Sequence, residues 1–173
     1  MKIPKKRRRQ GKTDYKARMS LLKGAKPRIV VRKTGRYVSA QYTKSNNAQD
    51  YVVCSAHSKE LLDYGWPESM KGSLKSLPAC YLTGMLIAKR IIKNEGKNNA
   101  VAVLDIGLAR NTAKSRIYAV LKGIVEGGSE KIIVPHKKES LPDDNRVRGA
   151  HLKGNIQEIF KSAREKIEKS ADK

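Results

Sequence analysis

The sequence has only two cysteines, few aromatic residues and no long apolar run. The two cysteines, Cys54 and Cys80, have no second cysteine or histidine at the spacing of metal ligands, and two thiols cannot form a disulfide framework. We therefore predict two reduced thiols and no metal site. No stretch approaches the roughly 18 consecutive apolar residues of a membrane span, and no apolar segment follows the basic start, as it does in a secretory signal peptide. We expect a soluble protein that is not secreted.

Acidic residues are also scarce, because 16 aspartates and glutamates stand against 38 lysines and arginines, a formal net charge of +22. Residues 1–36 contain 15 of these cations and one acid, Asp14, so that +14 of the charge lies there and +8 remains for residues 37–173. Such an excess repels itself unless an anionic partner neutralises it. Nucleic acid is the favoured partner, because a membrane-binding segment needs a wide apolar face and residues 1–12 offer only Met1, Ile3 and Pro4. A transit peptide or a nuclear localisation signal would also be Arg-rich and acid-poor.

Apolar periodicity predicts both helices and strands in this chain. Helices are indicated where apolar residues recur every three or four positions, and strands where they alternate or run together. The predicted helices cover residues 14–23, capped by Thr13, and residues 78–94, 117–126 and 152–167. The predicted strands cover residues 28–33, 36–43, 51–57, 100–107 and 131–135, with a tight turn at Thr34–Gly35 and polar loops at 44–50 and 136–148.

These elements predict an α/β fold, with a mixed five-stranded sheet flanked by helices. The first three strands should form an antiparallel meander. The segment 100–107 lacks alternation, which is typical of a central strand covered on both sides and reached by a helical crossover, parallel to the first strand. We divide the chain into a basic N-terminal arm with a short helix (1–26), an α/β core domain (27–135), and a loop with a C-terminal helix (136–173).

Sequence motifs of catalysis are absent. No phosphate-binding loop and no nucleophile elbow can be found, and the three histidines are scattered. A nuclease is the main enzymatic alternative, because a mixed sheet can hold a cluster of carboxylates that binds two metal ions. Only Asp105 sits at the end of the predicted central strand, while Asp50 precedes the third strand. Asp105 can equally be a turn residue whose oxygens accept from backbone amides.

Residue types suited to RNA binding are better represented. Guanidinium groups and hydroxyls suit phosphates, and a tyrosine can stack on an unpaired base. One such group lies on the first predicted hairpin and a second precedes the helix at 117–126: Arg28, Arg32, Arg36, Tyr37 and Gln41, and then Arg110, Thr112, Lys114 and Arg116. The alternative interpretation is that Arg32 and Tyr37 pair across strands and that the second group is a solvated loop.

Six blocks of the sequence together resemble a known family. They read RRRQGKTDYKAR, KPRIVVRKTGRYVSAQ, LPACYLTGMLIAKR, LDIGLARNTAKSRIYAVLKGIVEGG, IVPH and LPDDNRVRGAHL, and extend from about residue 5 to residue 155. In this order they resemble the archaeal and eukaryotic branch of the large-subunit ribosomal protein eighteen family, the binder of 5S rRNA. The short C-terminal end is similar to the archaeal members. The sequence departs from the family pattern at Gly35, where asparagine is frequent, and by an insertion at 129–131.

The resemblance implies a ribonuclease-H-like sheet without catalytic acids, and hence a scaffold with no enzymatic activity and no cofactor. It implies the cytoplasmic large ribosomal subunit as location and 5S rRNA, large-subunit rRNA and neighbouring large-subunit ribosomal proteins as partners, with no membrane or DNA partner. The residues expected to contact RNA come from the arm, the hairpin, the loop before the helix at 117–126 and the C-terminal region. They are Lys5, Lys6, Arg7, Arg8, Arg9, Lys12, Thr13, Tyr15, Arg18, Arg28, Arg32, Lys33, Arg36, Tyr37, Gln41, Arg110, Thr112, Lys114, Arg116, Arg146 and Arg148.

A second class of hypothesis is a docking protein whose main partner is another protein. Its interface would be the C-terminal helical region at 150–169, where acidic and basic residues are mixed. Both hypotheses remain open on the sequence alone.

Overall fold

The computed structural model describes residues 3–96, 99–152 and 155–169. The helices are α1 (Lys6–Arg9), α2 (Tyr15–Lys23), α3 (Leu77–Glu95), α4 (Arg116–Gly128), α5 (Asp144–Val147) and α6 (Ile156–Lys169). The strands are β1 (Arg28–Lys33), β2 (Val38–Asn46), β3 (Gln49–His57), β4 (Ala100–Val101), β5 (Val103–Asp105) and β6 (Ile132–Ile133). Short 3-10 helices occupy Ser58–Leu62, Glu68–Ser73, Ser129–Lys131 and Lys138–Ser140.

The strands form a four-stranded mixed sheet and a separate two-stranded parallel sheet, β4–β6, where one five-stranded sheet was predicted. In the larger sheet β1, β2 and β3 are antiparallel and β5 is parallel to β1. The segment predicted as one central strand is divided into β4 and β5, because its first half pairs with β6 and its second half with β1. The Ala102 amide donates to the Ile133 carbonyl at 3.0 Å and the Val103 amide to the Pro27 carbonyl at 2.9 Å, so the division falls between these residues. The order in the larger sheet is therefore β3-β2-β1-β5, and β4 and β6 pair with each other. This confirms the predicted α/β class with a ribonuclease-H-like arrangement.

The β2–β3 hairpin corrects one prediction. Residues 44–50, predicted as a polar loop, extend both strands, and Lys44 pairs with Tyr51 and Asn46 with Gln49. Asn47 and Ala48 make the turn, with φ values of 48° and 64°. Two consecutive residues with positive φ form the turn that matches the twist of paired strands. The usual sequence signal for this turn is Asn-Gly, and an alanine at its second position conceals it.

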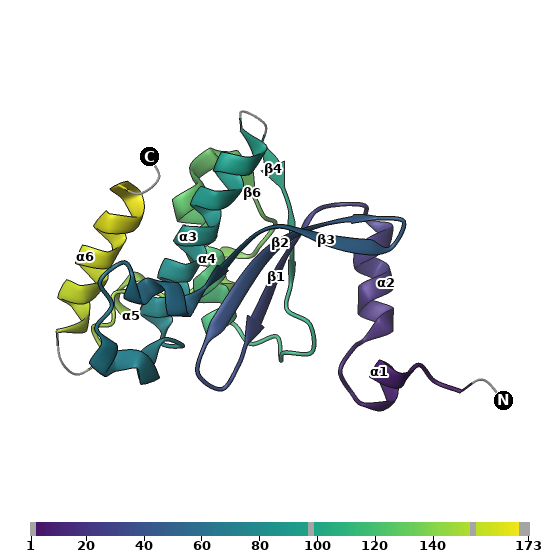
Figure 1. Cartoon of the computed structure of the whole chain (residues 1–173), viewed down its shortest axis with the longest axis horizontal. Helices are drawn as coiled ribbons and strands as arrows, with labels where there is room; N and C mark the ends of the chain where they lie inside the picture. Colours follow the sequence, from purple (N-terminus) through teal and green to yellow (C-terminus); the bar gives the residue numbers. More distant parts are fainter. Residues whose placement is uncertain (1–2, 97–98, 153–154, 170–173) are drawn as a thin grey trace.

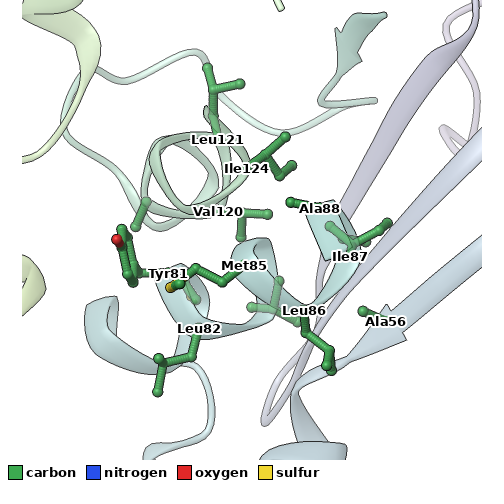
Figure 2. Packing of buried hydrophobic residues seen from close by; sticks show 14 of the residues in the cluster. Ala56, Tyr81, Leu82, Met85, Leu86, Ile87, Ala88, Val120, Leu121 and Ile124 are labelled. Atoms are coloured by element: carbon green, nitrogen blue, oxygen red, sulfur yellow. The ribbon is translucent and has the colours of Figure 1, made fainter. Parts of the chain in front are cut away.

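Helices α3 and α4 cover one face of the sheet, and α6 packs on the outer side of α3 (Figure 1). In Figure 2, Leu86 and Ile87 of α3 face the strands, while Met85 lies against Val120 of α4. Every residue of α3 from Leu77 to Ala88 is buried, in agreement with the broad apolar stripe of the sequence. The thiols of Cys54 and Cys80 are free, and burial raises the pKa of the Cys80 thiol to about 12. Among the described residues, none of the helices combines the length and the apolar character needed to cross a bilayer.

The crossing of α3 and α4 depends on two glycines that face each other's helix backbone. A Cβ atom added at Gly84 would lie 2.1 Å from the Val120 carbonyl oxygen, and one added at Gly123 would lie 2.1 Å from the Tyr81 carbonyl oxygen. Both distances are far below van der Waals contact. The two helices can therefore approach this closely only because neither position has a side chain.

We predict that Gly123→Ala lowers the free energy of unfolding by about 2–3 kcal/mol, because the added methyl group forces the two backbones apart. Chemical denaturation measures this change. Gly72→Ala is the matched control, since a Cβ atom there meets nothing within 4 Å. An unchanged stability of Gly123→Ala would contradict the close helix crossing.

Candidate nucleic-acid interface

A cleft with a volume of about 1240 Å³ brings together segments that are far apart in the sequence. Its walls come from the N-terminal arm, from β1, from the loop after β5, from the start of α4 and from the region around α5. Ten lysines and arginines and two acids line it: Arg7, Lys12, Arg18, Arg28, Arg32, Lys33, Arg110, Lys114, Arg116 and Arg146, with Asp14 and Asp105. The excess of positive charge in this concave surface suits the binding of a polyanion.

The cleft collects most, but not all, of the residues predicted to contact RNA. Besides the cations just named, Thr13 and Thr112 also line it. The remaining predicted residues lie outside its lining: Lys5, Lys6, Arg8, Arg9, Tyr15, Arg36, Tyr37, Gln41 and Arg148. For all of these residues, contact with RNA stays a prediction.

The N-terminal arm forms one side of the cleft. Helix α2 begins after Asp14, whose carboxylate accepts from the amides of Lys16 at 2.9 Å and Ala17 at 3.2 Å. Thr13, predicted as the cap, instead accepts from the Nε of Arg7 at 2.9 Å. Asp14 is the N-cap residue in place of Thr13, because its negative charge also interacts favourably with the helix dipole. Neither α1 nor α2 has a buried residue, and the arm projects from the core on the side opposite α6 (Figure 1).

Alternating charges connect the arm to the sheet. Arg18 of α2 pairs with Asp50 of β3 at 2.8 Å, and Asp50 also pairs with Arg28 of β1 at 2.6 Å. Arg28 reaches Asp105 at the end of β5 at 3.4 Å, and Asp105 pairs with Arg32 at 2.9 Å. Because the side chain of Arg28 is only 3% exposed, little of it is available for a direct contact with RNA. Its position favours an indirect role.

The pKa of the Asp50 carboxyl is shifted by its surroundings. Partial burial acts to raise that pKa, but hydrogen bonds from Ser45 and Arg28, together with the charges of Arg28 and Arg18, act in the opposite direction. The net result is a pKa below the usual value. Asp50 is therefore a carboxylate in the folded protein at neutral pH.

The loop after β5 forms a second side of the cleft. Asp105 accepts from the Gly107 amide at 2.8 Å, so its interpretation as a turn residue is confirmed. Arg32 donates to the Asp105 carbonyl at 2.8 Å, and a Cβ atom at Gly107, where φ is +61°, would lie 2.8 Å from the Arg32 guanidinium carbon. Arg110 and Arg116 are exposed, and within the described part of the chain neither has an ion-pair partner. Both guanidinium groups are thus free to bind phosphate.

Lys114 and Lys122 fix the segment around α5 beside this loop. Lys114 pairs with Asp143 at 3.1 Å, and the Lys114 amide donates to the Ser140 carbonyl at 2.8 Å. The ammonium group of Lys122, a buried residue of α4, donates to Asp144 and to the Pro142 carbonyl. These contacts place Arg146 in the cleft. Lys122 was not predicted as part of the site, because it lies outside the apolar stripe of its helix and its contact with Asp144 follows from the tertiary fold.

The β1–β2 hairpin presents its predicted residues differently. Arg32 lies opposite Ser39 and Lys33 opposite Val38, so the alternative in which Arg32 pairs with Tyr37 across the strands is wrong. The ring of Tyr37 is half-buried, with its centre 5.2 Å from that of His57. Arg36 is exposed at the tip, and Lys75 donates to the Gly35 carbonyl at 2.5 Å. The tip of the hairpin is thus held by Lys75, which lies just before α3 and outside the cleft.

A metal-dependent nuclease would need several converging carboxylates. In the residues that the structure describes, no group of three or more histidines, cysteines, aspartates or glutamates could hold a metal ion. The Asp105 carboxylate is occupied by Arg28 and Arg32, and Asp50 by Arg18 and Arg28. An arginine in each of these positions would oppose a metal cation. The geometry therefore disfavours the nuclease alternative.

A mixed α/β sheet with a cationic cleft and arginine-paired carboxylates defines a class of anion-binding proteins rather than metal-dependent enzymes. Comparison with known proteins narrows this class. The family described as "Ribosomal large subunit proteins 60S L5, and 50S L18" matches residues 1–102. The chain belongs to this family of ribosomal proteins, whose role is structural and not enzymatic.

Three archaeal relatives support this assignment, and each is named "Large ribosomal subunit protein uL18". The protein of Korarchaeum cryptofilum is 48% identical over 151 residues, covering 87% of this chain and 72% of the relative. The protein of Methanococcus maripaludis is 40% identical, covering 94% of this chain and 79% of the relative. The protein of Methanothrix thermoacetophila is 39% identical, covering 96% and 95%. The predicted archaeal branch and the location in the large subunit of the cytoplasmic ribosome are confirmed.

The Lys122–Asp144 contact generates a prediction about pH. The hydrogen bond from Lys122, and then its charge, lower the pKa of the Asp144 carboxyl below its usual value. A lowered pKa in the folded state stabilises that state above the unfolded value of about 3.9, and the contribution is lost as the pH falls through the folded value. We expect Asp144→Asn to destabilise by about 1 kcal/mol at pH 7, since Asp144 is largely exposed, and by progressively less in acid.

Denaturant unfolding of both proteins at pH 7 and at about pH 3 measures this difference. Asp63→Asn is the control, because Asp63 is exposed and forms no ion pair within the described residues. An Asp144→Asn deficit that is equally large at both pH values would show that charge is not responsible.

Proposed function

We propose that this chain binds 5S rRNA through the cleft and helps to attach it to the large-subunit rRNA in the central protuberance. The observation that supports this most strongly is the gathering of ten cations from five separate segments in one concave surface. Membership in a ribosomal family supplies the class of partner. The resemblance in the six sequence blocks supplies the 5S rRNA.

The chemistry of the cleft suits the backbone of a folded RNA. A-form helices hide their major groove, so proteins recognise backbone shape, 2′-hydroxyls and unpaired bases. The exposed guanidinium groups of Arg110, Arg116 and Arg146 can each form two parallel hydrogen bonds with a phosphate. Thr13 and Thr112 offer hydroxyls in the same cleft. This arrangement favours a helix or junction whose backbone passes between the arm and the loop after β5.

The residues outside the cleft have a separate place in the proposal. Lys6, Arg8 and Arg9 of α1 form an exposed cluster without buried residues, which suits contact with a second RNA segment such as large-subunit rRNA. Arg36 and the half-buried Tyr37 lie on the β1–β2 hairpin, where Tyr37 can offer one ring edge to a base. Arg148 is exposed just after α5. Neighbouring large-subunit proteins are further proposed partners.

The protein-docking alternative has less support. The apolar side of α6, formed by Ile156, Phe160, Ala163 and Ile167, is buried, and Phe160 contacts the ring of Tyr81 in α3 with 5.6 Å between centres. The helix begins at Ile156 and not, as predicted, near residue 152. Because its apolar side is occupied, α6 would have to bind a partner through its mixed-charge outer side. Such a contact would add to RNA binding and would not replace it.

The proposed function predicts a preference for 5S rRNA and a steep salt dependence. If about six to ten phosphates are neutralised, affinity should fall by roughly three to five decades between about 50 and 200 mM salt. Arg110→Gln combined with Arg116→Gln should reduce the slope of log K against log salt by about 2, because two phosphate contacts are removed. Fluorescence anisotropy with labelled 5S rRNA and an unlabelled structured competitor measures both quantities.

The matched control replaces two exposed lysines of α6, Lys161→Gln with Lys169→Gln, which removes the same charge away from the cleft. This control should change the slope by much less. Equal effects of the two double variants would mean that net charge, and not the cleft, sets the affinity. Equal binding of 5S rRNA and of the competitor by the unmodified protein would contradict the proposed partner.

A further inference from the structure

Besides Asp14, which caps α2, two carboxylates are placed among the cations of the candidate interface, where simple electrostatics would not put them. Asp105 lines the cleft and is buried, with 8% exposure, and Asp50 adjoins it through Arg28. A negative charge in a binding site for a polyanion repels the ligand. These two acids therefore oppose binding unless they contribute in another way.

Their contacts show what they could contribute. Asp105 joins β1 to the loop after β5, because it pairs with Arg32 at 2.9 Å and Arg28 at 3.4 Å, both in β1, and accepts from the Gly107 amide at 2.8 Å. Asp50 joins the arm to the sheet, since it pairs with Arg18 of α2 at 2.8 Å and with Arg28 at 2.6 Å. Ser45 also donates to Asp50, at 2.6 Å. Asp105 thus orients Arg32 and the loop after β5 on strands that are already paired, whereas Asp50 joins the arm to the sheet.

The position of Arg32 depends strongly on Asp105. Its guanidinium group donates to the Asp105 carboxylate, to the Asp105 carbonyl at 2.8 Å and to the Val31 carbonyl at 2.9 Å. Its side chain is nevertheless 43% exposed, so one side of the group stays accessible from the cleft. The close approach of Gly107 to the same group holds the loop against it. Arg32 is therefore presented in one orientation before any RNA arrives.

We propose that Asp105 and Asp50 are positioning residues of the RNA-binding cleft. They hold Arg32, the loop after β5 and the arm in the arrangement that recognises a folded RNA. This inference rests on the proposed RNA-binding function. Arg28, buried between the two carboxylates, is the shared partner that couples them.

The proposal and plain electrostatics predict opposite outcomes for one substitution. Asp105→Asn keeps the shape of the side chain and an oxygen for the Gly107 amide, but removes a negative charge from the cleft. If charge alone governs binding, the variant binds every RNA more tightly. If Asp105 positions the cleft, binding of 5S rRNA weakens about tenfold or more, while binding of an unrelated structured RNA stays the same or increases.

The ratio of the two affinities is the decisive readout, because an effect on global stability alone would not move it in a protein that remains folded. Glu130→Gln is the matched control, since Glu130 is exposed, forms no ion pair in the described residues and changes the net charge equally. This control should leave the ratio unchanged. A ratio that is also unchanged in Asp105→Asn would overturn the proposal.

Asp50→Asn provides the second variant, which decides the matter if Asp105→Asn does not fold. Asp50 is 25% exposed, and its loss should lower the same ratio by releasing the arm. Arg18→Gln should lower the ratio as well. The double variant Arg18→Gln with Asp50→Asn should lower it little further, since both changes break the same Arg18–Asp50 ion pair. Fully additive effects, or an unchanged ratio in Asp50→Asn, would contradict the proposal. Absence of any preference in the unmodified protein would contradict the proposed function instead.

Discussion

The burial of Arg28 between Asp50 and Asp105 is the contact on which the arrangement of the cleft depends. A buried guanidinium group is costly unless carboxylates and hydrogen bonds surround it, and here the partners come from β3 and β5. Through them the same contact reaches Arg18 in the arm and Arg32 beside the loop after β5. The sheet therefore determines where the arm and the loop after β5 lie. These two segments have little apolar surface and contribute accessible cations to the cleft.

The rigidity of the platform comes from a different source. Close packing of α3 on α4, made possible by Gly84 and Gly123, fixes the start of α4 at Arg116 relative to the sheet. Lys122, farther along α4, then holds the segment with Asp144 and Arg146. Apolar packing thus sets the position of the side of the cleft formed by the start of α4, and ion pairs set the position of the side formed by the arm.

Much of the fold could be predicted from the sequence because local patterns and tertiary packing agree there. Periodicity placed α3, α4 and β1 within a residue or two, since their apolar residues are the ones that become buried. The division of residues 100–105 between two partner strands could not be predicted, because pairing depends on neighbours distant in sequence. The candidate site shows the same limit. Residue type predicted Arg110 and Arg116, whereas the carboxylate partners of Arg28 and the contact of Lys122 with Asp144 follow only from the tertiary fold.

Hydrogen exchange of the full-length protein, free and saturated with 5S rRNA, tests most directly whether the cleft is the binding surface. We predict slower amide exchange on RNA binding in α2, in residues 106–115 and in residues 141–149, with little change in α6 or at the β4–β6 edge. Slower exchange concentrated in α6 or at that edge, with the cleft segments unchanged, would contradict it.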